Sequence, residues 1–211
     1  MQPNDVQRAP EPRKTLPPVI GICGPARSGK DEIARLLAAR HGYRRFAYAD
    51  ALRECLYVLD PWIGPTTRLS TAVDMLGWEG VKAEPELAAE VRRLLQRMGT
   101  EVGRGLISTD LWVHLLWQRI GAAQATRVVI SDVRFADEAA AIVQRDGLVV
   151  RVERPDAAGL LTGALAAHVS EHQPIPYSHL LVNDGTLEQL EQRVSGLLSD
   201  ARRSPIKDVT P

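Results

Sequence analysis

The residues best suited to chemistry lie near the start of the chain. Gly24, Gly29 and Lys30 have the spacing Gly-x-x-x-x-Gly-Lys, which is typical of a loop that binds phosphate. Glycine lets such a loop turn its backbone N–H groups towards an anion, and the lysine ammonium reaches the terminal phosphates of a nucleotide. An ordinary turn that caps a helix is the alternative, but the spacing and the lysine favour phosphate binding.

One position of this loop departs from the usual pattern. Asp31 stands where a serine or threonine hydroxyl usually touches Mg²⁺. We expect the donor nucleotide to be held by the loop, whose candidate residues are Gly24, Arg27, Ser28, Gly29, Lys30 and Asp31.

A second strong signal lies at the end of a β-branched run, from Thr126 to Ile130. Asp132 follows this run, and Arg134 comes two residues later. The pattern predicts a buried strand that delivers a carboxylate to the phosphate-binding end of a parallel sheet, where it holds Mg²⁺ directly or through water. A structural ion pair between Asp132 and Arg134 is the alternative.

A weaker signal follows the aromatic run from Tyr43 to Ala49, which predicts another strand. Ligands of open parallel sheets collect at the carboxyl ends of the strands, which gives Asp50 and Arg53 a functional interpretation. The alternatives are a helix cap for Asp50 and a solvated surface position for Arg53.

Strand and helix patterns alternate along the chain and predict a single α/β domain. The predicted strands are 18–22, 43–49, 126–132, 148–153 and 179–182, and the predicted helices are 32–40, 51–59, 71–78, 85–98, 108–120, 135–143 and 187–198. A polar turn is predicted from Gln96 to Arg104. It can bring Thr100, Glu101 and Arg104 into a cleft, although a plain connection between helices fits the composition equally well.

Composition limits the possible partners. The chain has 26 basic and 26 acidic residues, and a net charge of zero disfavours a protein that coats DNA or RNA. Cys23 and Cys55 have no metal-ligand spacing, and both are expected to be reduced thiols of a cytoplasmic protein. No apolar stretch approaches the ~18 residues that a membrane span needs. We therefore expect no membrane association and no stable nucleic-acid binding.

In their order and spacing, these motifs resemble those of the phage-type deoxynucleoside monophosphate kinases. The resemblance runs from Val19 to Val194 and rests on the segments Gly24–Asp31, Phe46–Arg53, Leu95–Glu101 with Arg104 and Trp112, Ser131–Phe135 with Glu138, and His168–Glu171. The family also has Asp after the loop lysine. The chain has Glu32 where the family often has Thr, so the hydroxyl that meets the metal stays open, with Ser28 as one candidate.

The resemblance implies a P-loop fold, a three-layer α/β/α sandwich with a parallel sheet of about five strands. It implies ATP and Mg²⁺ as cofactors, with Asp132 as the metal ligand, and a deoxynucleoside monophosphate as the substrate. The implied catalytic residues are Lys30, Asp132, Arg134, Arg151 and Arg154. The implied substrate-binding residues are Asp50, Arg53, Gly99, Thr100, Glu101, Arg104, Trp112, Asp132, Arg134 and Glu138.

The implied domain organisation is a disordered extension over 1–17, a kinase domain over 18–200 and a flexible tail over 201–211. Within the domain, 50–121 would bind the acceptor and 155–176 would form a lid that Arg151 and Arg154 flank. If a phage encodes the protein, its place is the host cytoplasm.

Several alternatives remain open. The loop also suits a kinase of another small acceptor, such as dephospho-coenzyme A, and a nucleotide-dependent switch or a DNA-handling ATPase belongs to a different class. A degenerate site that only binds nucleotide is a third possibility. A homodimer is among the oligomeric states considered.

Overall fold

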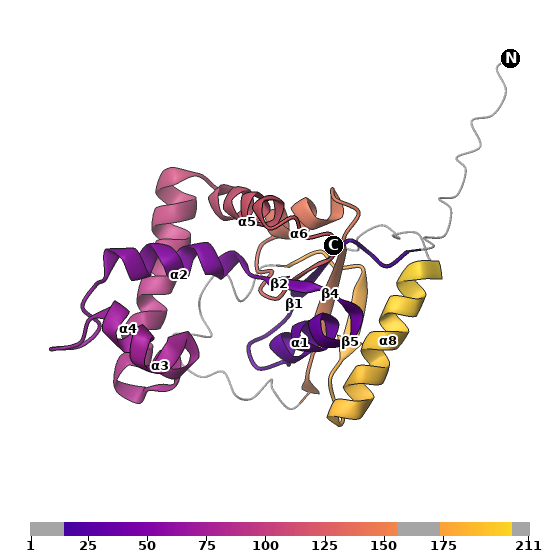
Figure 1. Cartoon of the computed structure of the whole chain (residues 1–211), viewed down its shortest axis with the longest axis horizontal. Helices are drawn as coiled ribbons and strands as arrows, with labels where there is room; N and C mark the ends of the chain where they lie inside the picture. Colours follow the sequence, from indigo (N-terminus) through magenta and orange to yellow (C-terminus); the bar gives the residue numbers. More distant parts are fainter. Residues whose placement is uncertain (1–14, 156–173, 204–211) are drawn as a thin grey trace, which may run out of the picture. The chain divides into compact units, whose positions relative to one another are not determined.

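The computed structural model describes residues 15–155 and 174–203 and contains a five-stranded parallel sheet (Figure 1). The strand order is β2-β3-β1-β4-β5. The strands are β1 (Val19–Cys23), β2 (Arg44–Phe46), β3 (Val128–Ile130), β4 (Leu148–Glu153) and β5 (His179–Val182). This arrangement confirms the predicted α/β fold with a parallel sheet of about five strands.

The chain divides into two compact units. The first, here called the sheet unit, consists of Met1–Arg45 and Thr126–Pro211, and the second, the helical unit, is Phe46–Ala125. The helical region predicted over 50–121 falls within the second unit. The predicted extension up to residue 14, the predicted lid over 156–173 and the tail from 204 lie outside the described residues.

Helices cover both faces of the sheet. Ile20 and Ile22 of β1 pack into one core with buried side chains of α1 (Lys30–His41) and α8 (Leu187–Arg203). Neighbouring strand residues point to opposite faces, so Gly21 faces the other side, where a Cβ atom would lie 2.4 Å from Ile142 Cδ1 of α6 (Ala136–Val143). The sheet unit therefore has the three layers of the predicted sandwich.

The register brings the carboxyl ends of the central strands to one edge. β1 lies between β3 and β4, with Gly21 opposite Ile130 and Cys23 opposite Arg151. Beyond the end of β3, the Val133 N–H donates to the Ile22 carbonyl at 3.1 Å. The loop after β1 and the segment after β3 therefore start side by side.

The helical unit has its own apolar core. Its elements are α2 (Tyr48–Leu59), α3 (Leu69–Ala83), α4 (Pro85–Gln96), the π-helix η1 (Arg97–Ile107) and α5 (Leu111–Ala122). The core is formed by Leu56, Ile63, Leu69, Ala72, Val81 and Val91. Burial of these side chains supplies the main driving force for packing the helices together.

The polar turn predicted from Gln96 to Arg104 is wrong, because α4 continues directly into η1. Trp112 of α5 is buried against this segment, and its indole N–H donates to the Gly99 carbonyl at 2.7 Å. A Cβ atom at Gly103 would lie 2.4 Å from the Trp112 ring. The glycines that resemble turn residues in the sequence therefore let a helical segment pack closely against an indole.

Two predicted strands are shorter in the structure, and this changes the setting of one candidate residue. β2 ends at Phe46 and α2 already begins at Tyr48, so Asp50 lies inside the first turn of a helix and not at a strand end. β3 ends at Ile130, so Asp132 follows its strand by two residues.

Candidate active site

The loop from Gly24 to Gly29 joins β1 to α1, as predicted for a phosphate-binding loop. Gly24 has φ 135°, and a Cβ atom there would lie 2.2 Å from the Val152 carbonyl oxygen. Gly29 has φ 98° and immediately precedes α1. Arg27, with φ 63°, is the only non-glycine residue of the described loop in this left-handed region. The backbone thus has the conformation for which glycine is needed at the two ends of the motif.

Asn183, which follows β5, supports this loop. Its side-chain amide donates to the Ser28 carbonyl at 2.9 Å, and its own backbone N–H donates to the Glu153 carbonyl at 2.7 Å. A Cβ atom at Gly29 would lie 2.3 Å from the amide nitrogen of Asn183. Asn183 is not among the candidate residues predicted from the sequence. Its position after a strand was the available signal, as it was for Asp132.

Lys30 is the first residue of α1, and its ammonium lies over the loop. It donates to the Gly24 carbonyl at 2.8 Å and to the Pro25 carbonyl. Two loop carbonyls are thus bound by the protein's own cation. The N-terminus of α1 adds partial positive charge at the same place, which favours an anion there.

Cys23 ends β1 directly before the loop and is buried. Burial raises the pKa of its thiol to about 11, against the opposing effect of the positive charges of Arg151 and Lys30. The side chain is therefore a protonated thiol at neutral pH and a poor nucleophile. Both cations nevertheless act on the end of β1, so two positive charges lie near the start of the loop.

Glu138 holds the segment that follows β3. Its carboxylate accepts the backbone N–H groups of Arg134 at 2.7 Å and Phe135 at 3.1 Å. Only 3% of Glu138 is exposed, and this burial raises its pKa to about 8. The negative charge of Asp132 also raises the pKa, whereas the hydrogen bonds from the two N–H groups lower it. Glu138 thereby fixes the segment that carries Asp132, which is half-buried, and Arg134, which is exposed.

Arg151 and Arg154 lie at the end of β4. Arg151 Nε donates to Glu153 Oε1 at 2.9 Å, and the Arg151 guanidinium lies 5.8 Å from the centroid of the Tyr177 ring. Arg154 follows the strand and is exposed. Arg151 is therefore held in a fixed orientation, and Arg154 extends into solvent.

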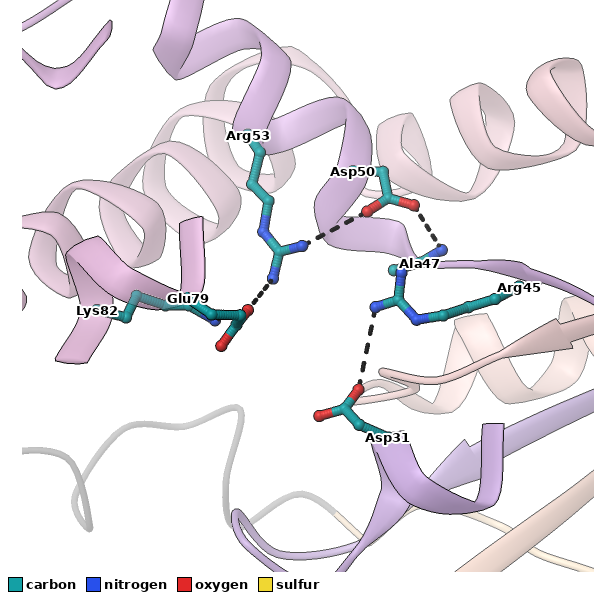
Figure 2. Close-up of polar contacts among 7 residues, drawn as sticks. All are labelled: Asp31, Arg45, Ala47, Asp50, Arg53, Glu79 and Lys82. Atoms are coloured by element: carbon teal, nitrogen blue, oxygen red, sulfur yellow. Dashed lines mark hydrogen bonds and ion pairs between the residues drawn. The ribbon is translucent and has the colours of Figure 1, made fainter. Parts of the chain in front are cut away.

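Asp31, whose place in the motif usually holds a hydroxyl, is highly exposed. Its Oδ1 lies 4.0 Å from Arg45 Nη2 (Figure 2). Two completely buried hydroxyl groups of the sheet unit, Ser28 Oγ and Ser131 Oγ, have no hydrogen-bond partner among the described residues. Orphaned buried hydroxyl groups beside the loop and after β3 are consistent with a polar ligand at this edge.

The loop and the segment after β3 meet the requirements of a magnesium nucleotide. Backbone N–H groups, a helix N-terminus and Lys30 suit a chain of phosphates. The carboxylate of Asp132 is an oxygen ligand of the kind that Mg²⁺ prefers. Within residues 15–155 and 174–203, no group of three or more His, Cys, Asp or Glu side chains is arranged to hold a metal ion.

The remaining candidates belong to the helical unit. Asp50 Oδ2 accepts the Ala47 N–H at 3.0 Å and so caps α2, while its Oδ1 lies 3.6 Å from Arg53 Nη1 (Figure 2). Gly99 and Trp112 are joined by the hydrogen bond given above. Glu101 is exposed and pairs with Arg97 at 3.2 Å.

Thr100 and Arg104 are half-buried residues of η1. The helical unit thus brings the predicted residues into two groups, one around Arg53 and one on η1 and α5. The sheet unit brings together the loop, Asp132, Glu138 and Arg151.

Comparison with known sequences gives one family. The sequence model of the family described as "Deoxynucleotide monophosphate kinase" matches residues 79–194. A protein of Acanthamoeba polyphaga mimivirus, provisionally named as a deoxynucleotide monophosphate kinase, is 26% identical over 197 residues, which cover 87% of this chain and 97% of the viral one. Mouse adenylate kinase 9 is 43% identical over 56 residues, which are 26% of this chain and 3% of that protein.

The similar solved structures have lower sequence identity to this chain than these relatives have. TT1252 from Thermus thermophilus is 21% identical with a TM-score of 0.44, and the match covers 88% of this chain and 98% of that one. A dephospho-CoA kinase from Campylobacter jejuni is 9% identical with a TM-score of 0.45, over 86% of this chain and 96% of that one. Across the described part of the chain, no helix has the length and apolar character of a membrane span.

Proposed function

Since the chain belongs to the deoxynucleotide monophosphate kinase family, we propose that it transfers the γ-phosphate of ATP to a deoxynucleoside 5′-monophosphate and releases ADP and the diphosphate. Family membership makes the chain a phosphotransferase that acts on nucleotides. The observation that supports ATP as the phosphate donor is the geometry of the loop from Gly24 to Gly29. The loop lies before residue 79, outside the family match, and so supports nucleotide binding independently.

The loop would hold the phosphates of ATP. Its backbone N–H groups and the N-terminus of α1 would bind the phosphate oxygens, and the Lys30 ammonium would move from the loop carbonyls to the transferred phosphate. Asn183 would keep the loop in shape by holding the Ser28 carbonyl. Mg²⁺, when bound, would neutralise charge on the phosphates, and Asp132 would hold it directly or through water.

No covalent step on the protein is needed. An oxygen of the acceptor's phosphate attacks the γ-phosphorus of ATP, the bond to the β-phosphate oxygen breaks, and ADP leaves. The protonated thiol of Cys23 has no role in this transfer. Arg134, Arg151 and Arg154 would stabilise the charge of the transferring group, so positioning and electrostatics carry the catalysis.

The acceptor would be bound by residues of the remaining motifs. Arg53 would bind its phosphate, and Thr100, Glu101 and Arg104 would contact the deoxynucleotide from η1. Trp112 would hold η1 through Gly99, since its indole N–H is already bonded to that carbonyl. Glu138 would act through the backbone of Arg134 and Phe135. Such a reaction belongs in the cytoplasm, or in a host's cytoplasm for a phage protein.

A coupled assay of ADP release tests this proposal with a panel of acceptors. The panel contains the four common deoxynucleoside monophosphates, the matching ribonucleotides, dephospho-coenzyme A and single- and double-stranded DNA. We expect turnover with at least one deoxynucleoside monophosphate and none with dephospho-coenzyme A. ATP hydrolysis stimulated by DNA, or turnover with dephospho-coenzyme A alone, would contradict the proposal.

A further inference from the structure

Arg53 of α2 has hydrogen-bond donors that the described residues do not satisfy. Its side chain is only 21% exposed, its Nη1 lies 3.6 Å from Asp50 Oδ1, and its Nη2 lies 3.7 Å from Glu79 Oε1 (Figure 2). Both separations are longer than a good N–H···O bond. Its Nε is completely buried and has no acceptor among the described residues.

A buried guanidinium nitrogen without an acceptor is costly, and native structures rarely leave one. The Arg53 guanidinium also lies 6.0 Å from the centroid of the Trp78 ring, which restricts its orientation. Nε and one Nη of an arginine form a fork that matches two oxygens of a phosphate or a carboxylate. The geometry of Arg53 therefore fits a bidentate anion.

A second cation lies beside Arg53. Lys82 Nζ is 2.6 Å from Glu79 Oε1, the same oxygen that faces Arg53, and the Lys82 side chain is only 24% exposed. The Glu79 side chain, by contrast, is 81% exposed. The well-solvated carboxylate of Glu79 thus lies next to two poorly solvated cations. An anionic ligand can take the place of this carboxylate, because Glu79 is already largely hydrated and loses little when it turns into solvent.

Asp50 differs from Glu79 in this respect. Its other carboxylate oxygen caps α2 by accepting the Ala47 N–H at 3.0 Å. Asp50 is therefore fixed in the helix and can keep Arg53 in place when Glu79 moves.

We propose that Arg53 and Lys82 form a binding site for a phosphate monoester, and that Glu79 is the counter-ion that the phosphate displaces. The ligand assignment rests on the proposed function, since it takes the monoester to be the 5′-phosphate of the acceptor nucleotide. The phosphate accepts hydrogen bonds from Nε and Nη2 of Arg53 and from Nζ of Lys82, while the Glu79 carboxylate turns into solvent. Competition from Glu79 weakens the binding of every phosphate ligand to the same extent.

Calorimetric titration of the full chain tests this site without requiring turnover. The probes are inorganic phosphate, a deoxynucleoside monophosphate and the corresponding deoxynucleoside. We expect Glu79→Gln to tighten phosphate and monophosphate binding by about two- to fivefold, the range for a solvated ion pair. Lys82→Met should weaken both by a similar factor, and Arg53→Lys by about tenfold, because lysine lacks the fork. Deoxynucleoside affinity should not change.

Glu54 and Arg119 provide matched controls. Glu54 is the next residue of α2 after Arg53, is exposed and pairs with Arg119 of α5. Glu54→Gln and Arg119→Met make the same charge changes in the same unit and should leave phosphate binding unchanged. Thermal unfolding of all variants checks that they are folded.

The outcomes separate this site from the proposed function. If Glu79→Gln and Glu54→Gln bind phosphate equally, or if deoxynucleoside affinity changes in step with phosphate affinity, the site is refuted even when the enzyme turns over deoxynucleotides. If the predicted pattern of phosphate affinities is found without turnover of any deoxynucleotide, the site is supported and the proposed kinase activity is refuted.

Discussion

At the scale of single residues, Lys30 and Asn183 act on the same loop. Lys30 binds the carbonyls of Gly24 and Pro25, and Asn183 binds the carbonyl of Ser28. Side chains thus satisfy carbonyls at both ends of the loop, which favours a backbone whose N–H groups are available to phosphate. Lys30 was predicted from the motif. The only sequence signal for Asn183 is its position after a strand, because its partner Ser28 lies 155 residues away in the chain.

Asn183→Ala should raise the KM for ATP about tenfold, because the variant loses one buried hydrogen bond to the loop and leaves the Ser28 carbonyl without its partner. The kcat should change less than the KM. Steady-state kinetics with varied ATP measures this effect, and Asp184→Ala, which removes a surface ion pair with Arg193, is the neighbouring control. An unchanged KM for ATP in a folded Asn183→Ala protein would show that Asn183 does not shape the loop.

Glu138 predicts a pH dependence of stability. Its pKa is about 8 in the folded protein against an ordinary value of 4.5, so the folded state binds the proton more tightly than the unfolded state does. The stability that this group contributes is complete below about pH 4.5 and is lost as the pH rises through about 8.

Glu138→Gln keeps an oxygen acceptor for the backbone N–H groups of Arg134 and Phe135 but cannot ionise. We therefore expect the midpoint of thermal unfolding of the variant to fall less than that of the wild type between pH 6 and pH 9. Melting curves recorded across this range measure the difference. If the unfolding midpoints of the two proteins change in parallel with pH, Glu138 does not have a raised pKa in the folded protein.

At the scale of elements, α3 is two helical segments joined at Gly77. Gly77 has φ 68° and ψ 167°, a conformation that essentially only glycine adopts, and it starts the short segment that carries Trp78, Glu79 and Lys82. A Cβ atom at Gly77 would meet nothing within 4 Å. The requirement for glycine is therefore one of backbone conformation and not of space.

Gly77→Ala should destabilise the helical unit by about 1–3 kcal/mol, the cost of a non-glycine residue in this region of φ and ψ. The matched control is Gly121→Ala, at a glycine of α5 that is equally free of neighbours but has no positive φ. That change should be neutral or stabilise by up to about 1 kcal/mol. Denaturant unfolding measures the free energy of unfolding of both variants. Equal values would contradict the requirement for glycine at position 77.

The elements that were predicted at the correct residues have ends that the sequence marks clearly. β4 and β5 are apolar runs bounded by polar or glycine residues, and both were predicted at the residues where they lie. The η1 segment was missed because Gly99 and Gly103 look like turn residues. The contact that makes Gly103 necessary comes from Trp112, on a different helix, and such a contact leaves no local signal.

At the scale of the whole molecule, the chain is a sheet unit with a helical unit inserted between β2 and β3. The phosphate motif and the Asp132 signal could be identified from the sequence because both depend on short stretches at strand ends, and the chemical roles assigned to them stay predictions. The charged group of the helical unit was predicted only in part. Asp50 and Arg53 were candidates, but Glu79 and Lys82 contact them from α3.

Direct observation of phosphate transfer tests the central claim most sharply. The chain is mixed with ATP labelled at the γ-phosphate and with each deoxynucleoside monophosphate, and the products are separated for the wild type and for Lys30→Met. We predict that the label appears in the β-phosphate of a deoxynucleoside diphosphate, one for each ADP formed, and that Lys30→Met lowers the rate by about a hundredfold or more while remaining folded. Label released only as inorganic phosphate, or full activity of a folded Lys30→Met protein, would contradict the account.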